Sequence, residues 1–189
     1  MKQYGLLLIA VVALGACQVQ QRQREDQTRA DPALATTELV DIAVVSPEVS
    51  TSDRRVLAAA IRAAARNVLI NRKHYAVPRD VFVDESAASS NATDAGTIAR
   101  AAGSDAGLII SLQQWETGDL LPKGRIYAGG TARLVASDGT RVLWERSFRD
   151  WTQVAARNVT ATNRAEVTRD MLRQVISEVL SNLPPKPRR

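Results

Sequence analysis

The chain of 189 residues has one cysteine, Cys17, and one histidine, His74. A single cysteine excludes a framework of intramolecular disulfides. One cysteine and one histidine are also too few for a zinc finger or for a site that needs two histidine ligands. We therefore expect neither a metal ion nor a cofactor.

Motifs for catalysis and nucleotide binding are missing as well. The chain contains neither G-x-G-x-x-G nor G-x-x-x-x-G-K-[ST], so no phosphate-binding loop is indicated. The segment Gly103-Ser104-Asp105-Ala106-Gly107 does not match a nucleophile elbow, because its serine directly follows the first glycine. His74 alone is available to a hydrolase triad, and it follows Arg72 and Lys73 at the expected end of a helix. We predict no catalytic residue and no enzymatic activity.

The composition that is present belongs to a folded protein. Apolar residues make up 45% of the chain and charged residues 24%, and the length suits one domain. The formal net charge is +5, a basic balance that invites a nucleic-acid interpretation. However, the basic residues are dispersed, and aromatic residues, at 4%, provide no platform on which bases stack. We predict no nucleic-acid partner.

The first seventeen residues carry the strongest signal in the chain. A start with one lysine, Met1 to Tyr4, precedes the apolar run Leu6 to Leu14, and small residues follow before Cys17. This order is typical of a secretory signal. The apolar run is too short to cross a bilayer as a helix, which needs about 20 residues. We predict a signal peptide over residues 1–16.

The sequence Leu14-Gly15-Ala16-Cys17 closely resembles the bacterial lipobox. The resemblance implies cleavage just before Cys17, a diacylglyceryl group on its sulfur, and a fatty acid such as palmitate on its new amine. Several acyl chains on one residue give stable membrane anchoring. Gln18, in place of an aspartate, implies sorting to the periplasmic face of the outer membrane, with the inner membrane as the alternative.

Polar segments flank the expected domain. Residues 18–36 show no apolar period, so we predict a lipidated cysteine and flexible tether over 17–36. The tail over 184–189 is rich in proline and basic residues, and we predict it to be disordered, with attraction to anionic lipid headgroups as an alternative role. The folded periplasmic domain is expected over 37–183.

Apolar periodicity predicts an α/β (α+β mixed) domain in the order β-α-β-α-β-β-β-α, with helices packed on a mixed sheet in a three-layer arrangement. Near-continuous apolar runs indicate buried strands, and apolar residues spaced three and four apart indicate amphipathic helices. Pro78 restricts one short strand to a sheet edge, and residues 87–91 are expected to form a loop. The expected strands lie over 39–45, 75–83, 106–112, 124–136 and 140–150, and the expected helices over 53–71, 93–103 and 163–183.

Asp138-Gly139 between two strand patterns predicts a tight hairpin. We expect Arg133 to face Trp144 across this hairpin as a cation–π pair. The paired glycines Gly129 and Gly130 lie inside a strand pattern, which indicates close packing or a bulge.

Helix ends are indicated by three patterns. Thr93 is expected to cap the shorter central helix at its start, and Gly103 to close it. The segment Asn163-Arg-Ala-Glu166 has the form of a capping box.

The element order resembles the periplasmic α/β domain at the amino end of TolB and in the lipoproteins LpoB and CsgG. The resemblance rests on Ile42 to Pro47, Tyr75 to Pro78, Gly103 to Ile110 and Asp138 to Glu145. It implies the fold of small outer-membrane lipoproteins of unsettled function, and it carries no catalytic signature. The long tether of LpoB-like proteins and the pore strands of CsgG-like proteins are absent from this sequence.

Two functions of different classes are consistent with these observations. The favoured one is a lipid-anchored binding or assembly module that recruits or regulates an envelope protein complex without catalysis. The alternative is an envelope hydrolase or small-ligand carrier with its site at the switch point of the sheet. In that case the loops 46–50 and 115–118 converge, and a polar cavity contacts Glu48 and Glu116.

A candidate partner site lies in the loop over 117–124. Leu120 and Leu121 occupy its centre, and Trp115 stands at its base. Exposed leucines beside a tryptophan would form an apolar contact patch for another envelope protein. The alternative is that both leucines fold back as a lid over a small apolar cluster.

Overall fold

The computed structural model describes residues 25–50 and 54–186, whose strands form one mixed sheet. The strand order is β1-β6-β5-β4-β2, and β3 also pairs with β4. Strands β2 and β3 run parallel to β4, and the other pairs are antiparallel. The predicted α/β class with a mixed sheet is confirmed. The strands are β1 (Glu25–Ala30), β2 (Ile42–Val44), β3 (Glu48–Val49), β4 (Ala106–Glu116), β5 (Arg125–Ala136) and β6 (Val142–Val154).

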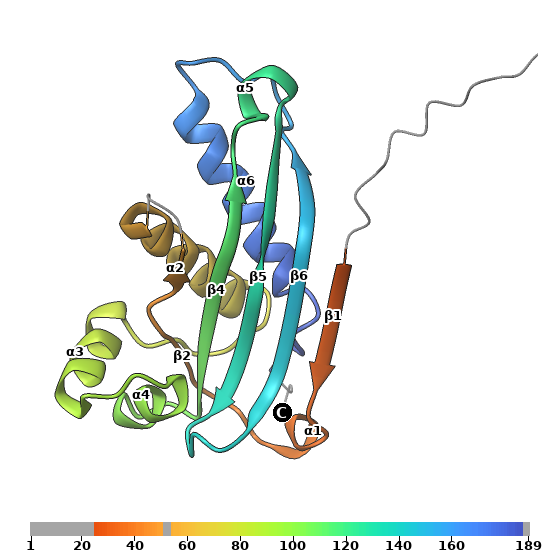
Figure 1. Cartoon of the computed structure of the whole chain (residues 1–189). Coiled ribbons are helices and arrows are strands. Elements are labelled where there is room, and N and C mark those ends of the chain that lie inside the picture. Colours follow the sequence, from red (N-terminus) through yellow and green to blue (C-terminus); the bar gives the residue numbers. More distant parts are fainter. Residues whose placement is uncertain (1–24, 51–53, 187–189) are drawn as a thin grey trace, which may run out of the picture.

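Helices cover both faces of the sheet around β4, as Figure 1 shows. The longer α2 and α6 pack on one face, where they bury the main apolar core. On the opposite face α3 and α4 bury a smaller core against β2 and β4. The helices are α1 (Ala33–Thr36), α2 (Arg54–Asn71), α3 (Asp80–Ser90), α4 (Ala95–Ala101), α5 (Leu120–Lys123) and α6 (Arg164–Val179). None of the helices in the described ranges is long and apolar enough to span a bilayer.

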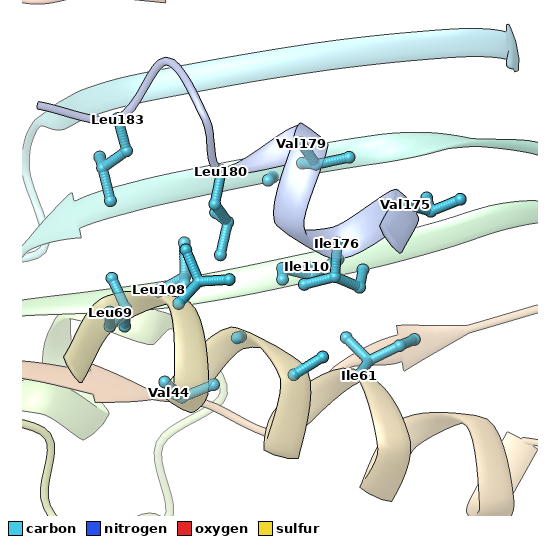
Figure 2. Packing of buried hydrophobic residues seen from close by; sticks show 14 of the residues in the cluster. Val44, Ile61, Leu69, Leu108, Ile110, Val175, Ile176, Val179, Leu180 and Leu183 are labelled. Atoms are coloured by element: carbon cyan, nitrogen blue, oxygen red, sulfur yellow. The ribbon is translucent and has the colours of Figure 1, made fainter. Parts of the chain in front are cut away.

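The main core lies where α2 and α6 meet on β4. Ile110 of β4 lies near Ile61 of α2 and Ile176 of α6 (Figure 2). Leu108 of β4 lies near Leu69 of α2 and Leu180, which follows α6. The apolar residues predicted for the last helix are all buried: Leu172, Val175, Ile176, Val179, Leu180 and Leu183. The helix itself ends at Val179, four residues before the expected end, so Leu183 packs from the turn that follows. In α2 the expected stripe consists of Val56, Leu57, Ala60, Ile61, Ala64 and Val68, of which Leu57, Ile61, Ala64 and Val68 are buried and Ala60 is partly buried. Val56 of the same predicted stripe is 70% exposed.

The predicted tether is partly wrong, because the folded unit already includes β1 and α1. All six residues of β1 pair with β6 in the register that joins Glu25 to Arg149 and Ala30 to Trp144. Backbone pairing needs no apolar side chain, so the polar sequence of β1 concealed the strand. The other end is corrected too, since the Pro184 carbonyl accepts a hydrogen bond from the Tyr75 hydroxyl at 3.0 Å. Residues 17–24 and 187–189 lie outside the described residues, as does the signal peptide.

The edge strand expected over 75–83 is wrong. Only an isolated bridge between Asp41 and Ala76 forms there. The chain from Asp80 to Ser90 is α3, so the expected loop over 87–91 is helical as far as Ser90, and Asn91 follows as the C-cap. Arginines of α2 hold this helix through its acidic residues, with Arg62 on Asp84 at 2.8 Å and Arg66 on Asp80 at 2.9 Å. Tertiary ion pairs thus override the strand propensity of the local sequence.

The hairpin at Asp138-Gly139 is confirmed, but its predicted register is wrong by one residue. Trp144 faces Leu134, and Arg133 faces Glu145 on the other side of the sheet. A bulge beside Leu134 shifts the pairing. The cation–π contact in this region is formed instead by Arg146, which lies 4.9 Å from the ring centroid of Trp151.

Two of the three predicted helix ends change. Asp94, not Thr93, caps α4 by accepting the Thr97 N–H at 2.8 Å, and this hydrogen bond lowers the pKa of the Asp94 carboxyl. Gly103, at φ 71°, follows α4 as predicted. The capping box at Asn163 is wrong. No side-chain bond caps α6, and the expected partner Glu166 pairs with Arg157 at 2.7 Å.

Candidate functional site

The predicted partner site at Leu120 and Leu121 forms a short helix, α5, at one end of the sheet. Leu120 is fully buried in the main core, whereas Leu121 is 44% exposed. Adjacent residues of a helix point about 100° apart, so the two leucines cannot share one role. Trp115 is partly buried against the same core. Of the two interpretations, the lid describes Leu120 and the exposed contact describes Leu121.

Leu121 belongs to a larger apolar surface that we call the α5-end patch: Leu121, Pro122, Val154 and Ala156, all exposed. The four residues line one hollow of about 400 Å³. Val154, the last residue of β6, is 55% exposed. The cations that line the same hollow are matched by carboxylates: Lys123 contacts Asp119 at 3.1 Å and Arg157 contacts Glu166 at 2.7 Å. The hollow therefore carries little excess charge.

The switch-point site of the alternative function is not assembled. Glu48 of β3 is the strand partner of Ser111 on β4, and its carboxylate accepts a hydrogen bond from the Ser111 hydroxyl. Glu116 accepts one from the Gln114 amide at 2.8 Å. Ser111 and Glu116 are five residues apart on β4, about 16 Å at the rise of a strand. Neither glutamate lines the hollows found between α2 and α6, at the α5 end, or beside α1.

A second surface, which sequence analysis missed, is a groove of about 720 Å³ between α2 and α6. Its floor is apolar and consists largely of Ala60, Ala63, Ala64 and Val68 from α2. Alanines leave this space because they are too short to reach α6. The run of alanines in α2 was visible in the sequence, but its position opposite α6 was not.

The rim of this α2–α6 groove is basic. Arg72, Arg169 and Arg173 line it, against one carboxylate, Glu178. Arg72 donates a hydrogen bond to Ser177 across the groove, and Arg173 contacts Asp170 at 2.7 Å. Burial, and secondarily the charge of Arg72, lower the pKa of the neighbouring Lys73. An apolar floor between cations suits an amphipathic segment with acidic side chains.

Two arginines are buried, and both join elements rather than form an open site. Arg62 is 7% exposed and donates to the Val44 carbonyl at 3.0 Å while it pairs with α3. Arg146 is 4% exposed and contacts Asp26 of β1, with 2.9 Å between Nε and Oδ1. It also donates to the Val179 carbonyl at the end of α6, at 3.0 Å, where the helix dipole favours a cation.

The remaining candidate groups do not form a reactive constellation in the described part of the chain. His74 is exposed and adopts φ 63° just beyond α2. Within residues 25–50 and 54–186, no three histidine, cysteine, aspartate or glutamate residues gather as metal ligands. Cys17 lies outside the described residues, so its lipidation stays a prediction.

Comparisons with known proteins identify the fold. No family model and no curated protein matches the chain. Among solved structures, a PelC dodecamer from Paraburkholderia phytofirmans is 19% identical with a TM-score of 0.54, over 83% of this chain and 96% of PelC. Lipoprotein GNA1162 from Neisseria meningitidis is 18% identical with a TM-score of 0.47, over 72% of this chain and 97% of GNA1162. The C-terminal domain of LpoB from Salmonella enterica is 16% identical with a TM-score of 0.43, over 65% of this chain and 88% of that domain.

These comparisons show that the chain shares the fold of PelC over most of both proteins. LpoB, one of the predicted resemblances, is among the similar structures. The resemblance to TolB and CsgG stays a prediction. At this level of identity a shared fold does not transfer an activity.

Proposed function

We propose that this chain is a lipid-anchored module of the bacterial envelope that binds other envelope proteins and performs no chemistry itself. The observation that carries the proposal is the α2–α6 groove, whose apolar floor and basic rim provide a surface for docking. The sequence Leu14-Gly-Ala-Cys17 supports export and lipidation. Gln18 supports the periplasmic face of the outer membrane as its location.

The groove fits a helix with an apolar stripe and acidic flanks. The alanine floor permits close approach of a partner helix, and its larger apolar residues would fill the hollow. Carboxylates on its flanks would meet Arg169 and Arg173, which are exposed on α6. Such rim charges act mainly on the rate and specificity of association, and they weaken as salt rises.

One candidate for the partner is a second copy of this chain. The solved PelC structure that shares this fold is described as a dodecamer. Closed symmetric assembly is common among oligomeric proteins. Self-assembly and binding of a different envelope protein give products of different mass, so one experiment separates them.

Charge reversal of the groove rim tests the proposal. The double variant Arg169→Glu/Arg173→Glu should reduce recovery of crosslinked partner from intact envelopes about fivefold or more, because it replaces attraction with repulsion. Crosslinked products are identified by mass spectrometry. Products at multiples of the protomer mass indicate self-assembly, and other masses indicate a different partner.

The matched control is Arg54→Glu/Arg55→Glu, which changes the net charge equally at two exposed positions of α2 outside the groove. Glutamates in the first turn of a helix are tolerated by the helix dipole. This control should keep normal recovery. Equal recovery from the groove variant and the wild-type chain would contradict docking at the groove.

A further inference from the structure

The direction of β1 indicates which end of the domain faces the membrane. β1 runs antiparallel to β6, and its first residue, Glu25, pairs with Arg149. β6 continues beyond Arg149 to Val154, which pairs with Arg125 directly after α5. Followed toward its start, β1 therefore points to the end of the sheet that carries α5 (Figure 1).

The distance to a lipid on Cys17 is short. Glu25 is eight residues after Cys17, and eight residues span at most about 28 Å when fully extended. The five steps along β6 from Arg149 to Val154 cover about 17 Å. An anchored chain that leaves β1 in the direction of the strand thus brings the α5 end to the bilayer surface.

Both ends of the sheet carry exposed apolar side chains. At the α5 end, Leu121 and Val154 are exposed together around one hollow. At the opposite end the hairpin exposes Asp138, Thr140 and Arg141, beside which Val142 is a solitary exposed apolar residue. The opposite end also has exposed apolar residues beside α1, namely Pro32, Ala35, Pro184 and Pro185. The direction of β1, however, places the α5 end next to the boundary between headgroups and acyl chains.

We propose that the α5-end patch docks on the bilayer that holds the Cys17 lipid, with Leu121 and Val154 inserted at the level of the headgroups. The proposal rests on the lipid anchor of the proposed function. It assigns this surface to a lipid membrane, and it leaves the α2–α6 groove free for proteins.

The contact is apolar in origin. Lys123 and Arg157 are matched by Asp119 and Glu166, so attraction to anionic lipid contributes little. A patch of this size would bind a membrane weakly by itself. The lipid on Cys17 makes the contact intramolecular, and the resulting high effective concentration allows a weak contact to persist. Docking should therefore occur on zwitterionic lipid and change little with salt.

Site-specific labels on the lipidated full chain test the orientation. Because the sulfur of Cys17 carries the lipid and no other cysteine is present, an introduced cysteine is the only free thiol. Leu121→Cys, Val154→Cys and the control Val142→Cys are labelled with a fluorophore sensitive to polarity. The proteins are reconstituted in vesicles of phosphatidylcholine, with and without a phospholipid that bears a nitroxide quencher at the headgroup boundary. An equimolar mixture with phosphatidylglycerol tests the role of lipid charge.

Labels at 121 and 154 should be quenched about twofold or more relative to the label at 142, in both lipid mixtures. Two patch positions protect the result against local misfolding of one variant. Equal quenching at all three positions, or stronger quenching at 142, would overturn the proposal. Mass spectrometry of each sample reports acylation. A chain without acyl groups refutes the anchor itself, whereas an acylated chain with an unquenched patch refutes docking alone.

Discussion

At the scale of single residues, the pairing of the central strands β4 and β5 depends on a glycine that lets their backbones approach closely. Gly130 of β5 lies against β4, where an added Cβ would stand 2.0 Å from the Ser111 carbonyl oxygen. The pairing shifts between Ala128 and Gly130, so the predicted close packing and bulge at this glycine pair are both present. The glycine is required because β4 approaches the β5 backbone more closely than any side chain permits.

Substitution at this position should be costly. Gly130→Ala forces apart two central strands, and we expect the free energy of unfolding to fall by about 2 kcal/mol or more. Gly118→Ala is the matched control, because no heavy atom lies within 4 Å of its added Cβ. The control should change stability by less than about 0.5 kcal/mol. Urea denaturation of both variants measures the difference, and equal stability would refute the role of Gly130.

At the scale of elements, β1 is held to the domain by polar interactions. Its six residues pair with β6, and Asp26 forms an ion pair with the buried Arg146. Arg146 in turn binds the carbonyls that end α6. One arginine thus joins the first strand, the sixth strand and the last helix, and β1 contributes a charge that this arginine needs.

Deletions on either side of Glu25 should therefore differ. Removal of 18–24 should leave the free energy of unfolding nearly unchanged. Removal of 18–30 should lower it by about 3 kcal/mol or more, because Arg146 loses its carboxylate while it stays buried. Chemical denaturation followed by circular dichroism measures both variants. The single substitution Asp26→Asn, which keeps the strand, should show part of the loss. If the longer deletion were as stable as the shorter one, β1 would be dispensable.

At the scale of the whole molecule, the two proposed binding surfaces occupy different parts of the domain. The proposed membrane contact lies at the α5 end, and the groove lies along the face covered by α2 and α6. A domain docked at one end of its sheet would present the groove sideways to the periplasm. This arrangement allows membrane attachment and protein binding at the same time.

The anchor itself is tested at Cys17. Cys17→Ser should abolish incorporation of radiolabelled fatty acid and remove the protein from the membrane fraction, because no other thiol can accept the lipid. Gln18→Asp is the control that separates anchoring from sorting. It should keep full labelling while the protein moves to the inner-membrane fraction. Undiminished label on the serine variant would refute lipidation at Cys17.

Predictability differed between parts of the chain for identifiable reasons. The stripe of α6 and the hairpin at Asp138-Gly139 are local patterns, so sequence analysis located both. The register of that hairpin failed because one bulged residue near Leu134 moves every later pair. In the candidate partner site, Leu120 is buried and Leu121 is exposed, because adjacent residues of a helix point about 100° apart and the sequence had indicated a loop.

The sequence by itself determined the class of fold and the helices that cover the main core, because each depends on residues close together in the chain. Only the tertiary structure decided that the polar segment Glu25–Ala30 is a strand, since the free edge of β6 supplies its hydrogen bonds. It also decided that Arg146 is buried and that α2 faces α6 across a groove. These features join residues more than 100 positions apart, and no local pattern encodes which distant groups will meet.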